Sequence, residues 1–278
     1  MYPTSISPRF LRAAFVNGLL FLCVMAHAAD ALAQTSGPDA TPTPKTAAVT
    51  STSSAPLISL SSLPTLTEVS SQNSAIIPEV QDVPLHRSFV ELAKKGGIDV
   101  LFVGDSITDW WRSTGKDVWV KYYGSMKAAN FGIAGNTTQD VLWRLQNGEG
   151  EGFQPKVVVL MIGTNNFGRN TDAQVAEGVA AVVHELRTRF ASAKILLLGI
   201  FPRGPKENPV RDRVRNTNLL IAKLDDGKNV FYLDIGAKFL EPDGTLTAEI
   251  MPDGLHPSAK GYEIWGAAMQ EPLAKLLK

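Results

Sequence analysis

The chain has 278 residues, 44% of them hydrophobic and 8% aromatic, which is enough to bury a full core in one or two domains. Lys plus Arg and Asp plus Glu number 27 each, so net charge gives no reason to expect nucleic acid or an anionic membrane surface as the main partner. The composition favours a small-molecule or neutral-polymer partner.

The N-terminus has the pattern of a secretory signal peptide. Arg9 and Arg12 precede the apolar run 13–26, and "ALA" at 31–33 supplies small residues for cleavage. The run is too short for a comfortable membrane span, which needs about 20 residues. We therefore predict a signal over 1–33, a secreted or periplasmic protein, and no membrane span after cleavage. A retained anchor is the alternative.

The only cysteine, Cys23, lies inside this apolar run, and Leu22 before it does not fit lipoprotein processing. Removal of the signal would leave no cysteine in the mature chain. Disulfides, thiol catalysis and cysteine-based metal sites are then excluded, although export is still allowed. We expect neither a metal nor a cofactor.

Ser, Thr, Pro and Ala dominate the next segment, which has too few large apolar residues to form a core. We predict a disordered tether over 34–83 and one globular domain over 84–278. As a flexible coil the tether would span roughly 40 Å.

Within the domain, short apolar runs alternate with segments of helical periodicity. The β-branched content and continuous apolarity of the longest runs are typical of strands covered on both faces. The expected strands are 98–104, 127–132, 156–163, 194–200 and 229–235, and the expected helices are 137–147, 172–190, 209–225 and 257–276. This alternation predicts a doubly wound α/β domain with a parallel sheet and helices on both sides.

Ligands of such sheets bind outside the carboxyl ends of the strands. The segments that follow the five expected strands are Gly104-Asp105-Ser106, "GIAGNTT" (132–138), "GTNNFG" (163–168), "FPRGPKENP" (201–209) and, after a loop, "MPDGLHP" (251–257). A serine, a glycine turn, two asparagines and an Asp with a His therefore fall on one edge.

Only one of the four histidines lies at this edge. His27 leaves with the signal, His86 precedes the first strand, and His184 points away from the apolar stripe of its helix. His256 follows Asp253 by three residues at the expected site.

These residues meet the needs of acyl transfer: Ser106 as nucleophile, His256 as base, and Asp253 to orient the imidazole. The alternative is that Asp105 or Ser106, and likewise Asp253 and His256, only cap helices. Asn136 with Gln139 resembles a capping box that would set the Gly135 amide beside a positive helix end. The Ser106 amide, the Gly135 amide and the Asn165 side chain would form the oxyanion hole.

Four sequence blocks follow one another along the chain: Gly104-Asp105-Ser106, "NFGIAGNTT" with Gly135, "GTNN" with Asn165, and "DGLH" with Asp253 and His256. With these blocks in this order, the region from about 86 to 276 resembles the GDSL/SGNH hydrolase superfamily. "NFGIAGNTTQDVLWRLQNGE" and "IGTNN" are similar to the catalytic subunits of platelet-activating factor acetylhydrolase and their secreted bacterial relatives. The resemblance implies a three-layer α/β/α, flavodoxin-like fold with a mostly parallel five-stranded sheet and metal-free hydrolysis of short acyl esters. The serine tetrapeptide is Gly-Asp-Ser-Ile rather than Gly-Asp-Ser-Leu, a change of one aliphatic residue for another. Because the signal and tether are foreign to the cytosolic subunits, their phospholipid substrate is not carried over.

The expected function is a serine esterase acting on O-acetyl groups of a glycan. Rival functions are a lysophospholipase, thioesterase or arylesterase of the same fold and a non-catalytic carbohydrate-binding protein. Trp110 and Trp111 are candidates for a sugar or acyl platform, with core packing of at least one as the alternative. Arg203 is a candidate for binding an anionic substrate group, or for structuring its loop. The sequence says nothing about the oligomeric state.

Overall fold

The computed structural model describes residues 73–278, so the predicted signal peptide and residues 34–72 of the predicted tether lie outside the described residues. Five parallel strands form one sheet in the order β2-β1-β3-β4-β5. The strands are β1 (Val100–Gly104), β2 (Ala128–Gly132), β3 (Val157–Met161), β4 (Lys194–Leu198) and β5 (Val230–Leu233). All five lie inside the ranges expected from the apolar runs, so the predicted sheet is confirmed.

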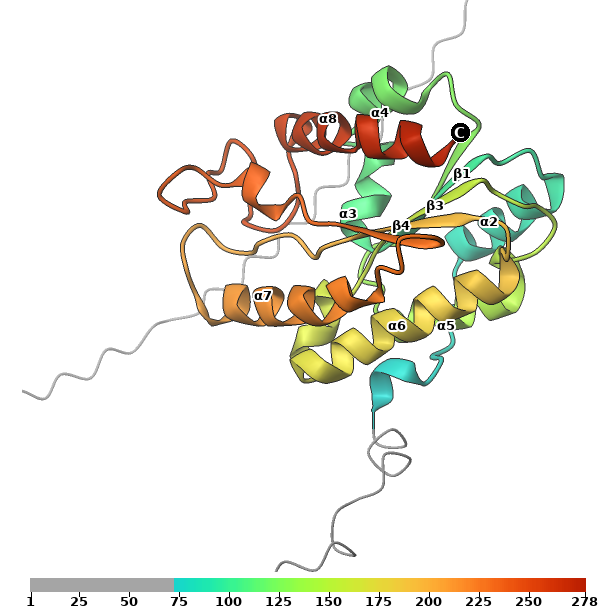
Figure 1. The fold of residues 1–278 in the computed structure, drawn as a ribbon, viewed down its shortest axis with the longest axis horizontal. Helices are drawn as coiled ribbons and strands as arrows, with labels where there is room; N and C mark the ends of the chain where they lie inside the picture. The colour runs from blue at the N-terminus through green and yellow to red at the C-terminus, as the bar shows by residue number, and fades with distance from the viewer. Residues whose placement is uncertain (1–72) are drawn as a thin grey trace, which may run out of the picture. The chain divides into compact units, whose positions relative to one another are not determined.

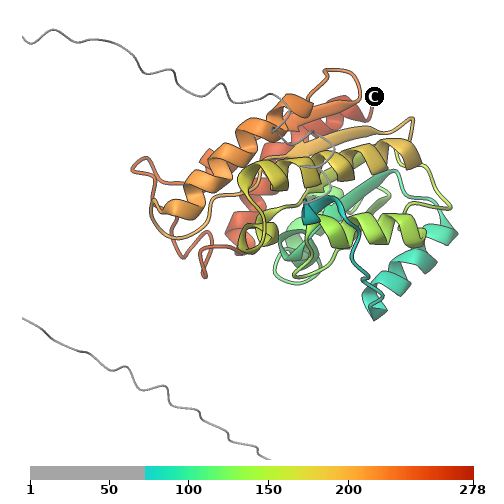
Figure 2. The ribbon, with the colours of Figure 1, turned by 90° about the horizontal axis from the view of Figure 1, so that it is seen from below.

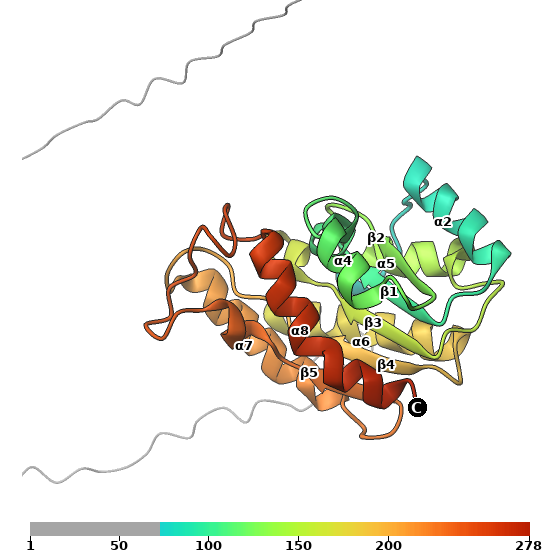
Figure 3. The same ribbon diagram turned by 90° about the horizontal axis from the view of Figure 1, so that it is seen from above.

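Helices cover both faces of this sheet, which makes three layers (Figure 1). The longer helices are α2 (Pro84–Lys95), α4 (Lys116–Tyr123), α5 (Thr138–Arg144), α6 (Asp172–Arg189), α7 (Pro209–Ile221) and α8 (Ala259–Leu276). Helices α5, α6 and α7 lie side by side on one face (Figure 2), and α4 and α8 lie on the other (Figure 3). The predicted three-layer α/β/α arrangement is therefore confirmed.

Two buried clusters explain why the strands are apolar on both sides. Alternate residues of β1, such as Leu101 and Val103, pack with α5 and α6, whereas Val100 and Phe102 pack with α4 and α8. The second cluster contains Trp111, Tyr262 and Trp265, each 1% exposed or less. A strand buried on both faces has no polar face to show, and so its sequence is a continuous apolar run.

The short helix α3 (Ser106–Asp109) follows β1 after a single residue, Asp105, whose side chain caps it. Gly104 makes this sharp turn feasible. A Cβ at Gly104 would lie 2.2 Å from Thr108 Oγ1 and 2.5 Å from the Met161 carbonyl oxygen. Glycine therefore lets the first turn of α3 pack directly on the end of the strand, with Ser106 at the sheet edge.

The domain begins earlier than the predicted boundary at residue 84. Asn73 caps the short 3-10 helix η2 (Ser74–Ile76), and Ala75 is fully buried. The Asn73 amide donates to Glu177 Oε2 on α6 at 2.7 Å, and the Ala75 carbonyl accepts from Thr138 Oγ1 on α5 at 2.7 Å. Residues 73–77, which were predicted to belong to the tether, are therefore packed on α5 and α6. They are held mainly by hydrogen bonds rather than by the large apolar residues that composition detects.

No helix in the part of the chain from residue 73 onward is long and apolar enough to cross a membrane.

Candidate active site

Ser106, His256 and Asp253 form one hydrogen-bonded series at the carboxyl edge of the sheet. Ser106 Oγ lies 2.9 Å from His256 Nε2, and His256 Nδ1 lies 2.6 Å from Asp253 Oδ2. Ser106 follows β1, whereas Asp253 and His256 lie in the turn before α8, and His256 comes 150 positions after Ser106 in the chain. The sheet topology brings these distant segments together, as expected for residues that follow the carboxyl ends of parallel strands.

The Asp253 carboxylate holds both the imidazole of His256 and the backbone that carries it. Its Oδ2 faces Nδ1, and its Oδ1 accepts the backbone N–H of His256 at 2.8 Å and of Leu255 at 3.0 Å. Burial acts to raise the pKa of Asp253, but the hydrogen bonds from His256 and Leu255 outweigh it and bring the pKa to about 2. The carboxylate is therefore ionised at neutral pH and accepts a hydrogen bond from Nδ1–H, which leaves Nε2 free to accept a hydrogen bond from the Ser106 hydroxyl.

Of the two capping alternatives, the one for Asp105 is correct and the one for Asp253 and His256 is wrong. Asp105 caps α3 through the Ile107 amide at 3.0 Å, and Ser106 is the first residue of that helix. The cap of α8 is Ser258, however, and not Asp253 or His256. A capping role for Asp105 leaves the Ser106 hydroxyl free to face the imidazole.

The three predicted oxyanion donors follow three neighbouring strands. Ser106 comes after the middle strand β1, Gly135 after β2 and Asn165 after β3. The Ser106 amide begins a helix, where an amide has no partner within the helix. The Gly135 amide has no hydrogen-bond partner among residues 73–278. Asn165 Nδ2 donates one hydrogen to the Asn136 carbonyl at 2.9 Å, which leaves its second hydrogen for another acceptor.

The helix after Gly135 begins one residue later than the sequence suggested. Thr137, not Asn136, is the cap of α5, and its amide donates to the Asp140 carboxylate at 2.7 Å. The expected box of Asn136 with Gln139 was wrong, because the side chain of Asn136 has a different partner. Gly135 adopts a φ of 80°, and this left-handed turn carries the chain from β2 to the cap.

The side chain of Asn136 binds the fully buried Arg144, which was not predicted from the sequence. Arg144 Nη1 donates to Asn136 Oδ1 at 2.6 Å, and its other nitrogens bind both oxygens of Glu149 at 3.0 and 2.7 Å. Glu149 also lies 2.8 Å from Nδ1 of the buried His86. This network holds Asn136, and Asn136 in turn accepts from Asn165. No local sequence signal marks Arg144, since an arginine on a helix is usually exposed.

The two tryptophans have different environments. The Trp110 ring is stacked on the His256 ring, with centroids 4.0 Å apart and planes 23° apart. Trp111 is 1% exposed and packs against Tyr262, Trp265 and Tyr123. Trp111 as part of a substrate platform was therefore wrong: the turn after α3 directs its side chain into the core. One face of Trp110 is occupied by the imidazole.

Among the other candidates, His184 is exposed on α6 as expected, and His86 is bound to Glu149. Arg203 is partly buried, donates to Thr164 and lines a pocket together with Asp253.

A family model described as "GDSL-like Lipase/Acylhydrolase family" matches residues 102–264. The chain is 39% identical over 214 residues to the alpha2 subunit of platelet-activating factor acetylhydrolase IB from Gallus gallus, covering 74% of this chain and 90% of the relative. A putative platelet activating factor from Streptococcus pneumonia has the same fold, with a TM-score of 0.58, 22% identity, and coverage of 68% and 91%. An acetylxylan esterase from Geobacillus stearothermophilus superposes with a TM-score of 0.51, 21% identity, and coverage of 66% and 94%.

The family match spans more than half of the chain and includes the end of β1, Ser106 and the turn with Asp253 and His256. The curated relative is well above the identity at which family membership is secure. The chain belongs to the GDSL-like lipase/acylhydrolase family and is a carboxylic ester hydrolase.

Proposed function

We propose that the protein is a serine esterase that removes short acyl groups, in particular O-acetyl groups from carbohydrate, through an acyl-enzyme on Ser106. The single observation that carries the catalytic assignment is the series Ser106 Oγ, His256 Nε2, His256 Nδ1 and Asp253 Oδ2, with contacts of 2.9 and 2.6 Å.

In the first half-reaction, Ser106 Oγ attacks the ester carbonyl carbon while His256 Nε2 takes the hydroxyl proton. The carbonyl oxygen becomes an oxyanion, which accepts from the amides of Ser106 and Gly135 and from Asn165 Nδ2. His256 then gives its proton to the leaving alcohol as the carbon–oxygen bond breaks. The ionised Asp253 stabilises the imidazolium in between.

In the second half-reaction, His256 takes a proton from water, and the hydroxide oxygen attacks the acyl carbon. Collapse of the second tetrahedral intermediate returns the proton to Ser106 Oγ and releases the carboxylic acid. Every proton step uses Nε2, which requires that Nδ1 stay bound to Asp253 throughout.

Two observations support a short acyl group on a polar alcohol. The curated relative is named an acetylhydrolase, and the pocket that adjoins Asp253 is lined by polar as well as apolar side chains. Carbohydrate hydroxyls suit such a mixed lining. We do not propose platelet-activating factor, the substrate in the relative's name, for this protein, because the predicted secretion signal would direct it away from the cytosol.

Acyl length and alcohol are tested separately. We expect rates on p-nitrophenyl acetate, butyrate and octanoate to fall in that order, and acetate to be released from an acetylated polysaccharide. The Ser106→Ala variant is the matched control and should lack both activities. A rate maximum at octanoate would favour a lysophospholipase, thioesterase or arylesterase instead.

We also propose export through the signal peptide, with 34–72 as a tether. Cell fractionation with N-terminal sequencing of the mature protein tests this. A mature protein that begins near residue 34 outside the cytosol is expected, whereas an intact N-terminus on a cytosolic protein would contradict export.

A further inference from the structure

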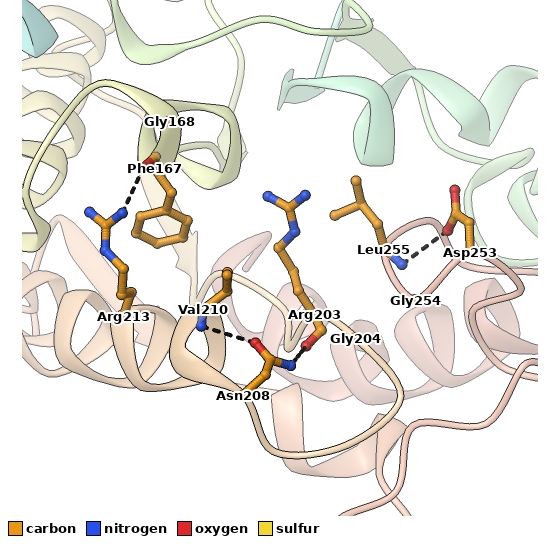
Figure 4. A pocket seen from close by; sticks show the side chains of 10 residues that line it. All are labelled: Phe167, Gly168, Arg203, Gly204, Asn208, Val210, Arg213, Asp253, Gly254 and Leu255. Carbon is orange, nitrogen blue, oxygen red and sulfur yellow. Dashed lines mark hydrogen bonds between the residues drawn. The ribbon is translucent and has the colours of Figure 1, made fainter. Parts of the chain in front are cut away.

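A pocket of about 550 Å³ adjoins the loop of Asp253 and His256 (Figure 4). Its walls are the segment after β3 with Phe167, the loop after β4 with Arg203, and Asp253 and Leu255. His256 contacts both Ser106 and Asp253, and Asp253 and Leu255 line this pocket, so the pocket lies within reach of the alcohol portion of an ester bound at Ser106. The pocket is thus the place where groups on the alcohol portion would be recognised.

Of the two arginines that line this pocket, only Arg203 has N–H donors without a hydrogen-bond partner in the described part of the chain. Its Nη1 donates to the carbonyl and the hydroxyl of Thr164 at 3.1 and 3.3 Å. Within residues 73–278, its Nε and Nη2 make no hydrogen bond, and no carboxylate lies within ion-pair distance of it. A partly buried guanidinium in this state favours an anionic partner.

Arg213 lines the same pocket but has no such capacity. Its Nε donates to Asp172 at 2.6 Å, Nη1 to the Phe167 carbonyl at 2.6 Å, and Nη2 to the Asn170 carbonyl at 2.5 Å. The charge of Arg213 is paired and its nitrogens are all engaged. The two arginines therefore differ in availability although they share a cavity.

The backbone that carries Arg203 is held in place before any ligand binds. Arg211, which is 2% exposed, donates to the carbonyls of Arg203 at 3.2 Å, Gly204 at 2.6 Å and Gly244 at 2.6 Å. The Gly204 amide donates to the Gly254 carbonyl at 2.7 Å, next to Asp253. These bonds fix Arg203 relative to the catalytic loop, so a ligand does not have to order it.

The acidic residue in the pocket does not cancel this charge. Both oxygens of Asp253 accept hydrogen bonds from His256 or Leu255, so its charge is directed at the imidazole. No salt bridge joins Asp253 to Arg203.

Resting on the proposed function, we propose that Arg203 binds an anionic group, a carboxylate or a phosphate, on the alcohol portion of the ester. The enzyme then selects acyl esters of acidic alcohols, such as acetylated acidic sugars, over neutral ones. Selection arises because two donors of a pre-positioned guanidinium become paired only when the substrate carries the anion.

The test compares ω-acetoxyalkanoates of three to six carbons with the corresponding ω-acetoxyalkanamides, which are neutral and of equal size. A set of ω-acetoxyalkyl phosphates separates phosphate from carboxylate. For each pair, the ratio of kcat/KM is measured from acetate release with the wild type, Arg203→Gln, Arg203→Lys and Arg213→Gln. Melting temperatures show whether each variant is folded.

We expect the wild type to prefer the anion by about tenfold or more at one chain length, since charge-assisted hydrogen bonds are the strong ones. Arg203→Gln should lose this preference, Arg203→Lys should keep part of it, and Arg213→Gln should keep it. No preference at any length, or a preference that survives Arg203→Gln, would overturn the proposal.

Failure of the proposed function gives a different result. If Ser106→Ala still released acetate, the nucleophile would be wrong, but the pocket could still be tested by binding. For that purpose 6-hydroxyhexanoate and 6-hydroxyhexanamide are titrated into Ser106→Ala and followed by NMR. Tighter binding of the carboxylate, abolished by Arg203→Gln, supports the anion site, and equal binding of the two contradicts it.

Discussion

Asp105 lies between the end of β1 and Ser106 and is 1% exposed. One carboxylate oxygen accepts from the Ile107 amide, and the other has no hydrogen-bond partner in the described part of the chain. Burial raises the pKa of Asp105 from 3.8 to about 7, although the Ile107 amide and the charge of Arg203 act to lower it. The folded protein therefore holds this proton more tightly than the unfolded chain.

The sign of the effect on stability follows from this difference. The stabilising contribution of protonated Asp105 is fully present below pH 3.8 and is lost as pH rises to about 7. The gap between 3.8 and about 7 corresponds to a loss of about 4 kcal/mol. Asp105→Asn cannot ionise and keeps the acceptor for Ile107, but it buries an unpartnered amide at a cost of about 1–3 kcal/mol at every pH.

The free energy of unfolding of Asp105→Asn relative to the wild type should therefore rise by about 4 kcal/mol between pH 4 and pH 8. The variant should be the less stable protein at pH 4 and the more stable one at pH 8. Urea unfolding of both proteins, followed by tryptophan fluorescence at a series of pH values, measures this difference.

Asp226→Asn is the matched control. Asp226 is exposed, and the amides of Val230, Asn229 and Lys228 hold its pKa well below the usual range. In both the folded and the unfolded wild type, Asp226 is then almost fully ionised above about pH 5. The difference in free energy of unfolding between Asp226→Asn and the wild type should therefore be nearly constant from pH 5 to pH 8. If the difference in free energy of unfolding between Asp105→Asn and the wild type is also flat with pH, burial does not raise the pKa of Asp105.

Three further results are expected. Asn165→Ala should lower kcat by roughly 10²–10³ with little change in KM, because the free Nδ2 hydrogen of Asn165 binds the oxyanion in the transition state. If kcat is unaltered and only the melting temperature falls, Asn165 serves only to bind the Asn136 carbonyl. Trp111→Ala should destabilise the fold by about 3–5 kcal/mol, measured by urea unfolding, because the ring is enclosed in the core; a loss of only substrate affinity would contradict this. A chain starting at Pro84 should melt at a lower temperature than one starting at Asn73, because it lacks the contacts of 73–77 with α5 and α6, and equal melting temperatures would restore the boundary at residue 84.

The strands could be predicted because a parallel sheet buries both faces, which makes β1, β3 and β4 continuous apolar runs. Helix α2 was missed, although Pro84 at its first turn and the buried Phe89 and Ala93 carry a helical signal. Helix α4 is only eight residues long, and its ends have no side-chain cap, so periodicity had little to act on.

The sequence predicts those residues of the candidate site that lie at the ends of strands. Ser106, Asn165 and His256 all follow from the order of strands and from residue types. The link from Arg144 through Asn136 to Asn165 could not be predicted, because it depends on how α5 packs on the sheet. The burial of Trp111 beside the partly buried Trp110 is likewise decided by the turn after α3 and not by composition.

The proposed mechanism requires that Ser106 alone carries the acyl group. Wild-type protein is treated with an alkyl fluorophosphonate and digested, and the adduct is located by peptide mass mapping, with Ser106→Ala and His256→Ala treated in parallel. We expect one adduct per chain on the peptide that contains Ser106, a much slower adduct with His256→Ala, and none with Ser106→Ala. An adduct on another serine, or full labelling and full esterase activity in Ser106→Ala, would contradict it.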